Sequence, residues 1–212
     1  MKKMNTPNKL TVLRMILVPA IMVVMLLPYS IFNNILALLI FSAASVTDLL
    51  DGIIARKYNL ITDFGKFLDP LADKFMVIAA IFGIICRYSG FGIGSDAHIN
   101  EYMFWTFMAM LIITVFRELA VASIRLITAK RANVVVAANM LGKTKTVAQM
   151  ICIILALVEP VAHDIIAHYV PDFFFYGFYP LTLLAAAVSI VFTIWSGLNY
   201  ICSYWKYMDP ED

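Results

Sequence analysis

The chain contains 212 residues, of which 62% are hydrophobic and 14% charged, and its mean hydropathy is +0.86. Soluble domains average about 45–50% apolar and roughly 25% charged residues, so this composition is typical of a protein surrounded by lipid. The apolar content excludes disorder, and three cysteines are too few for a disulfide scaffold. A net charge of +2 is too small to indicate a nucleic-acid partner. We therefore predict one integral membrane domain over residues 1–212.

Six hydrophobic runs predict an all-α, polytopic membrane protein. The runs are apolar on all sides, as in residues 78–85, whereas the strands of a membrane barrel alternate apolar and polar residues. The predicted spans are 10–28, 32–53, 67–88, 103–127, 144–160 and 179–202. Turn-forming residues separate them at 28–30, 90–95, 130–133 and 159–160. The first run contains Arg14 and Pro19 and no small-residue cleavage site, so we predict a membrane helix there and not a cleavable signal.

The placement of lysine and arginine predicts the orientation in the membrane. With six spans, one set of helix ends collects Lys2, Lys3, Lys9, Arg56, Lys57, Lys66, Lys130, Arg131, Lys143, Lys145 and Lys206. The opposite ends carry Arg87 alone. By the positive-inside rule both termini are expected to be cytoplasmic, in a multi-pass protein of the cell membrane.

Charged residues lie inside three of the predicted spans, where they are costly. These residues are Asp48, Asp51, Asp69, Asp73, Lys74, Arg117, Glu118 and Arg125. A charge at the centre of the bilayer costs about 2.5–3.5 kcal/mol, so such residues normally face a partner, an ion or an aqueous cavity. In the third span the uncharged part, 75–86, is too short to cross alone. We therefore expect the functional site among these charges.

The four aspartates are spaced so that two helices each present a pair of carboxylates. Asp48 and Asp51 are three residues apart, and Asp69 and Asp73 are four apart, so each pair lies on one helix face. The two helices must run antiparallel, which places both pairs near the cytoplasmic level. Four carboxylates packed together would repel one another, and two divalent cations would cancel their charge.

The residue types favour a hard metal ion. The three histidines fall in the predicted outer loops, away from the aspartates: His98, His163 and His168. An all-carboxylate site suits Mg²⁺ or Mn²⁺ better than zinc. Two such cations can clamp a pyrophosphate and stabilise a leaving oxygen, so phosphoryl chemistry is indicated.

Read as a whole, this segment is Asp48-x2-Asp51-Gly52-x2-Ala55-Arg56-x8-Gly65-x3-Asp69-x3-Asp73. Its small residues would let a bulky ligand approach the backbone closely. At every position the segment resembles the motif of the CDP-alcohol phosphatidyltransferase family of membrane enzymes. Eight fixed residues at fixed spacing make this resemblance specific.

The resemblance implies six transmembrane helices, a homodimer and an active site that faces the cytoplasm. It implies that Asp48, Asp51 and Asp69 hold two divalent cations, Mg²⁺ or Mn²⁺, with help from Asp73, which would also be the general base. The residues that it implies for CDP-lipid binding are Asn8, Thr11, Arg14, Asp48, Asp51, Gly52, Ala55, Arg56 and Gly65.

The acceptor alcohol is indicated by a further resemblance. Arg117-Glu118, Arg125 and the segment 142–149 resemble the branch of the family that uses glycerol 3-phosphate, as does the opening segment 5–11. An anionic acceptor needs cationic partners, and the candidates for binding its phosphate are Arg117, Arg125, Lys143 and Lys145. The two lysines project to opposite sides of a helix, so we expect one of them to reach the acceptor.

The resulting hypothesis is transfer of a phosphatidyl group from CDP-diacylglycerol to glycerol 3-phosphate, with release of CMP. The same family also offers other acceptors, as in a cardiolipin synthase or a phosphatidylinositol phosphate synthase. A cation channel or transporter is an alternative of another class, but the aspartates lie on only two helices and no inverted repeat is visible. The last span, with Trp195, Tyr200 and Trp205, is predicted to face lipid.

Overall fold

The computed structural model describes residues 5–58, 62–90, 100–132, 140–170 and 177–205. Within these residues the protein is all-α, as predicted. Its helices are α1 (Thr6–Leu26), α2 (Ile31–Lys57), α3 (Asp63–Tyr88), α4 (Glu101–Ala132), α5 (Met140–Tyr169) and α6 (Pro180–Tyr204). Each of the six hydrophobic runs corresponds to one helix, and most helices extend a few residues beyond the run.

Local capping sets where the two aspartate-bearing helices begin. The hydroxyl of Ser30 accepts a hydrogen bond from the backbone N–H of Asn33, 3.1 Å away, at the start of α2. The hydroxyl of Thr62 accepts one from the N–H of Gly65 at the same distance, at the start of α3. Such caps satisfy N–H groups that a helix leaves without an internal partner. The predicted turn at 28–30 is confirmed, because α1 ends at Leu26 and α2 begins at Ile31.

Two predicted breaks are wrong. Helix α4 continues to Ala132, through most of the predicted turn at 130–133. Helix α5 continues through Pro160 to Tyr169, so His163 and His168 lie in a helix and not in a loop. Proline removes one backbone N–H from a helix, but membrane helices tolerate this loss because neighbouring groups satisfy the freed carbonyl.

Glu159, which precedes that proline, was predicted to form part of a turn, but it has another role. Glu159 is only 4% exposed, and its carboxylate accepts hydrogen bonds from the N–H groups of Leu181 (3.0 Å) and Thr182 (2.7 Å). These residues belong to the first turn of α6, where Tyr179 provides no side-chain cap. Glu159 thus caps α6 from a neighbouring helix.

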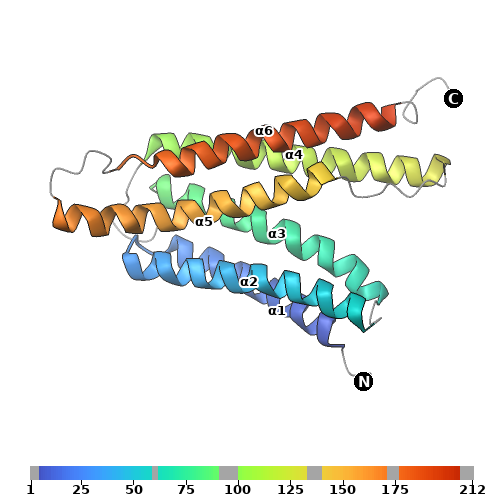
Figure 1. Ribbon diagram of the computed structural model, residues 1–212, viewed down its shortest axis with the longest axis horizontal. Helices are drawn as coiled ribbons and strands as arrows, with labels where there is room; N and C mark the ends of the chain where they lie inside the picture. The colour runs from blue at the N-terminus through green and yellow to red at the C-terminus, as the bar shows by residue number, and fades with distance from the viewer. Residues whose placement is uncertain (1–4, 59–61, 91–99, 133–139, 171–176, 206–212) are drawn as a thin grey trace.

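The six helices form two groups that lie side by side along the long axis of the molecule (Figure 1). Helix α1 packs against α2 and α3, and α6 packs against α4 and α5. Contacts of α3 with α4 and of α2 with α5 join the groups. Fully buried apolar side chains from all six helices fill the interior, among them Ile21, Phe41, Ile81, Phe107, Ile153 and Ala186.

The outward faces of the helices are apolar, as expected where lipid is the solvent. Large exposed side chains include Phe32, Leu39, Trp105, Phe116 and Leu184, each more than 60% exposed. Among the helices of the described segments, five are long and apolar enough to cross a membrane: α1, α2, α4, α5 and α6. Helix α3 is not among these five, because its first half carries five charged residues. The chain is therefore an integral membrane protein.

Candidate active site

An acidic cluster forms where α1, α2 and α3 meet, and a buried arginine lies at its centre. The guanidinium of Arg14 in α1 is fully buried. Its Nη1 lies 3.0 Å from Oδ1 of Asp48 and 2.6 Å from Oδ1 of Asp73, and its Nη2 lies 2.5 Å from Oδ2 of Asp51. The structure therefore brings three of the four aspartates to one point. One positive charge among four carboxylates leaves most of their negative charge unbalanced.

The fourth aspartate is held one helical turn away by α1. The hydroxyl of Thr11, 1% exposed, donates a hydrogen bond to Oδ1 of Asp69 at 2.6 Å. Oδ1 of Asn8 accepts one from the hydroxyl of Thr62 at 3.0 Å. A Cβ at Gly65 would lie 3.1 Å from Oδ1 of Asn8, so a larger residue would require the Asn8 side chain to shift by a few tenths of an ångström. Of the three polar residues predicted on the first helix, Thr11 and Arg14 thus contact the aspartates directly, and Asn8 contacts Thr62 at the start of α3.

The remaining residues of the aspartate motif lie on α2. Gly52 is part of that helix, one residue beyond Asp51. Ala55 and Arg56 belong to the same helix, but their side chains lie outside the described residues. In the part of the chain that the structure describes, no three His, Cys, Asp or Glu side chains are placed to hold a metal ion. The oxygens of three aspartates point at the guanidinium of Arg14 instead.

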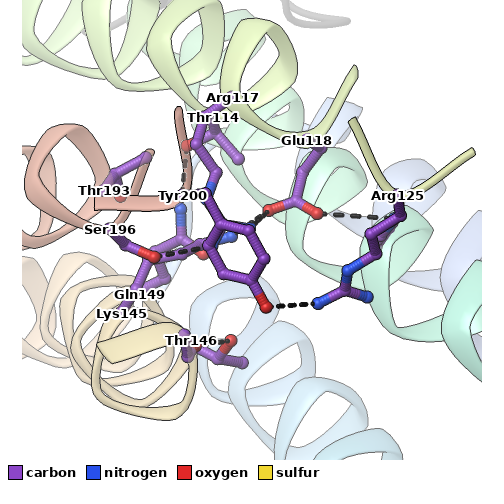
Figure 2. A network of polar contacts seen from close by, with 12 residues as sticks. Thr114, Arg117, Glu118, Arg125, Lys145, Thr146, Gln149, Thr193, Ser196 and Tyr200 are labelled. Atoms are coloured by element: carbon purple, nitrogen blue, oxygen red, sulfur yellow. Dashed lines mark hydrogen bonds and ion pairs between the residues drawn. The ribbon is translucent and has the colours of Figure 1, made fainter. Parts of the chain in front are cut away.

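A second cluster, on α3, α4 and α5, gathers cations around one carboxylate (Figure 2). Glu118 forms an ion pair with Lys145, another with Arg117 at 2.8 Å, and a third with Lys74 at 3.4 Å. Lys145 is only 5% exposed. Three positive charges around one negative charge leave this cluster cationic, so it is suited to an anion.

Helix α6 completes the cationic cluster. The hydroxyl of Ser196 accepts a hydrogen bond from Nη2 of Arg117 at 2.6 Å, and the hydroxyl of Tyr200 accepts one from Nη2 of Arg125 at 2.8 Å. Both guanidinium groups also lie over the ring of Tyr200, at 5.8 and 5.4 Å from its centre. A Cβ at Gly197 would lie 3.2 Å from Cγ of Arg117, so glycine provides room for that side chain.

A cavity of about 180 Å³ connects the acidic and cationic clusters. It is lined by Pro70, Asp73, Lys74, Val77, Ile78, Thr114, Arg117, Glu118, Lys145, Thr146 and Gln149. Pockets for drug-sized ligands usually measure roughly 300–1,000 Å³, so this one has room for a smaller molecule. Its wall combines a carboxylate from the aspartate motif with three cationic side chains.

The four residues predicted to bind the acceptor phosphate are placed differently. Arg117 and Lys145 line the cavity, whereas Lys143 is exposed and does not line it. Of the two lysines, only Lys145 is therefore placed at this cavity. Arg125 lies beyond the cavity wall and contacts Tyr200.

Sequence reasoning missed several residues of the cationic cluster. Tyr200 was predicted to face lipid, but it is 3% exposed and contacts two arginines. Helix α6 carries a signal that could have shown this, because its buried residues are largely polar: Thr182, Ser189, Thr193, Ser196 and Tyr200. A polar stripe at helical spacing on an otherwise apolar helix indicates a face turned toward a site.

The protein has several membrane-spanning helices, and an acidic cluster lies beside a cavity lined by cations. These features are typical of a membrane enzyme that acts on charged substrates. The chain belongs to the CDP-alcohol phosphatidyltransferase family, whose sequence model matches residues 4–196.

Curated relatives share this family and nearly the full length of the chain. The chain is 35% identical to the CDP-diacylglycerol–glycerol-3-phosphate 3-phosphatidyltransferase of Bacillus subtilis, over 95% of this chain and 96% of that protein. It is 31% identical to the protein of the same name from Pseudomonas fluorescens, over 98% and 94% of the two chains. For that of Shigella flexneri serotype 5b the identity is 33%, over 93% of each chain.

Proposed function

We propose that the protein transfers the phosphatidyl group of CDP-diacylglycerol to glycerol 3-phosphate, giving phosphatidylglycerol phosphate and CMP. The observation that carries the proposal is the cavity in which Asp73 lies beside Lys74, Arg117 and Lys145. A small phosphorylated alcohol needs a cationic site for its phosphate and a proton acceptor for its hydroxyl. The names of the relatives support the same reaction.

In this reaction Asp73 takes the proton of the 1-hydroxyl of glycerol 3-phosphate. The freed oxygen attacks the β-phosphorus of CDP-diacylglycerol, the bond to the bridging oxygen of the pyrophosphate breaks, and CMP leaves. Lys145 and Arg117 hold the acceptor phosphate, with Lys74 at the rim of the cavity. Asn8, Thr11, Arg14, Gly52, Ala55, Arg56 and Gly65 bind the CDP-lipid together with Asp48 and Asp51. Positioning of two anionic substrates accounts for much of the rate enhancement.

We propose that two divalent cations, Mg²⁺ or Mn²⁺, are held by Asp48, Asp51 and Asp69 with help from Asp73. The donor chemistry supports this: carboxylate oxygens are hard ligands, and three of the four carboxylates already converge on a positive group, Arg14. When bound, the cations would neutralise the pyrophosphate and stabilise the leaving oxygen.

The orientation and the assembly are also part of the proposal. We propose that α3 crosses the membrane as a sixth span, with its charged half facing the site and not lipid, and that both termini and the site are cytoplasmic. The uneven distribution of lysine and arginine supports this orientation. The family resemblance suggests a homodimer, which the molar mass of the detergent-solubilised protein would test.

The reaction is tested by incubating the purified protein with CDP-diacylglycerol and a panel of labelled acceptors. Glycerol 3-phosphate is expected to give labelled lipid and an equal amount of CMP. Glycerol, inositol, inositol phosphate and phosphatidylglycerol are expected to give at least tenfold less. Equal use of glycerol and glycerol 3-phosphate would contradict the proposed phosphate site, and exclusive use of another acceptor would replace the proposed reaction.

Removal of divalent cations is expected to abolish CMP release. The four aspartates carry more negative charge than Arg14 balances, so CDP-lipid binding should depend on added cations. The measurement is CMP release after treatment with a chelator, followed by addition of Mg²⁺ or Mn²⁺, each of which should restore it. Full activity in excess chelator would show that no exchangeable cation takes part.

Labelling of single cysteines tests the orientation. Lys57 is exposed at one end of α2 and Tyr169 at the opposite end of the bundle, 79% exposed. In a cysteine-free background, an impermeant maleimide should label Tyr169→Cys in intact cells and Lys57→Cys only after lysis. Labelling in the opposite order would place the site outside the cytoplasm.

A further inference from the structure

A buried neutral pair forms part of the cavity wall, next to the charged groups. Gln149 is 1% exposed and Thr114 is 2% exposed. Nε2 of Gln149 donates a hydrogen bond to Oγ1 of Thr114 at 2.8 Å. Both residues line the cavity that also contains Asp73 and the three cationic side chains.

In the proposed orientation, the pair lies one helical turn deeper in the membrane than the cations. Thr114 precedes Arg117 by three residues on α4, and Gln149 follows Lys145 by four residues on α5. Because α4 enters the site from the outer side and α5 leaves it toward that side, both displacements point toward the membrane interior. At 1.5 Å per residue, Gln149 lies about 6 Å deeper than Lys145 along the axis of α5. The cavity therefore has a charged level and, below it, a neutral level.

The pair has hydrogen-bonding capacity that the protein leaves unused. A carboxamide offers two N–H donors and one carbonyl acceptor, and a hydroxyl both donates and accepts. The bond between Gln149 and Thr114 uses one donor and one lone pair. Within the described segments, Oε1 of Gln149 has no hydrogen-bond partner. This oxygen is not among the fully buried unpaired atoms of the described residues, so it is open to the cavity, where it can accept a hydrogen bond from a ligand donor.

Glycerol 3-phosphate supplies one group for each part of this cavity. Its phosphate matches the cations, and its reacting 1-hydroxyl matches Asp73. Its 2-hydroxyl lies between the phosphate and the 1-hydroxyl and has no partner among the charged side chains. The neutral pair is the remaining polar group of the cavity wall that could bind it. We propose that Gln149 and Thr114 bind the 2-hydroxyl and so select glycerol 3-phosphate over phosphorylated alcohols that lack it. This inference rests on the proposed function.

The test compares glycerol 3-phosphate with 3-hydroxypropyl phosphate, which lacks only the 2-hydroxyl. Wild-type kcat/KM should be at least thirtyfold higher for glycerol 3-phosphate, because sites built to bind a hydroxyl strongly reject analogues without it. In Gln149→Leu and in Thr114→Val this ratio should fall at least tenfold. The fall should come from the glycerol 3-phosphate value, and kcat/KM for 3-hydroxypropyl phosphate should stay within threefold of wild type.

Thr146→Val is the matched control. Thr146 lines the same cavity, but its hydroxyl already donates to the carbonyl of Gly142 at 3.1 Å. Its substrate ratio should stay within threefold of wild type. Two variants are used in case one fails to fold, which size-exclusion chromatography of the detergent-solubilised variant would reveal.

The outcomes separate the inference from the reaction on which it rests. A wild-type enzyme that uses glycerol 3-phosphate but does not discriminate against 3-hydroxypropyl phosphate would overturn the inference alone. So would an unchanged ratio in whichever of Gln149→Leu and Thr114→Val folds. A wild-type enzyme that uses neither phosphate would overturn the proposed reaction itself.

Discussion

Asp73→Asn is expected to lower kcat by at least a hundredfold while the KM for CDP-diacylglycerol changes less than threefold. The side-chain amide retains the shape of the carboxyl group, but it cannot accept the proton of the acceptor hydroxyl. General-base catalysis typically contributes about 10²–10⁴-fold to a rate. Asp73 is the aspartate of the motif that both contacts Arg14 and lines the cavity with the cationic side chains. The measurement is CMP release at saturating concentrations of both substrates.

A matched control for this variant lies at the opposite end of the bundle. Asp164 in α5 is also a hydrogen-bonded carboxyl group, with the hydroxyl of Tyr29 as its donor, but it is far from the cavity in the chain and in the fold. Asp164→Asn should keep kcat within threefold of wild type. If Asp73→Asn does the same, another group must accept the proton.

Lys145→Ala is expected to raise the KM for glycerol 3-phosphate by tenfold or more, whereas Lys143→Ala should leave it within twofold. The two lysines are two residues apart on α5, yet Lys145 is buried at the cavity and Lys143 is exposed. Loss of a charge-assisted phosphate contact costs about 1.5–3 kcal/mol, or roughly one to two decades in affinity. Initial rates at varied glycerol 3-phosphate give both values.

Removal of Lys145 should leave the surrounding ion pairs in place. Without Lys145, Glu118 still has Arg117 at 2.8 Å and Lys74 at 3.4 Å, so its buried carboxylate keeps cationic partners and the fold should persist. The KM for CDP-diacylglycerol, expected to change less than threefold, reports on that. Equal KM values for glycerol 3-phosphate in the two variants would show that the phosphate binds elsewhere.

The helices could be predicted from the sequence because lipid imposes a simple rule on composition. Each run of apolar residues became one helix, and the i, i+3 and i, i+4 spacing of the aspartates correctly placed each pair on one helix face. The position of Arg14 could not be predicted in this way. Its three carboxylate partners come from two other helices, and no spacing within α1 encodes them.

The cationic cluster was less predictable, because its residues are scattered over four helices. Glu118 contacts cations from α3, α4 and α5, and only packing brings these together. Tyr200 was misread for a physical reason: a tyrosine near the end of a membrane helix also suits the lipid–water interface. The break predicted at Pro160 was wrong because proline was interpreted as a local turn signal. The neighbouring Glu159 instead binds the first turn of α6, a contact that the sequence around Pro160 does not reveal.

The cap that Glu159 provides at the start of α6 also affects the position of the α6 residues that reach the cationic cluster. The two hydrogen bonds to the side chain of Glu159 fix how α6 is rotated about its own axis relative to α5. Lys145 lies fourteen residues earlier on α5, about 21 Å along its axis, where Ser196 and Tyr200 approach from α6. The two helices are therefore aligned from the end opposite the site by their own side chains and backbone. The position of Tyr200 beside its two arginines therefore depends in part on Glu159, which lies near the opposite end of the same two helices.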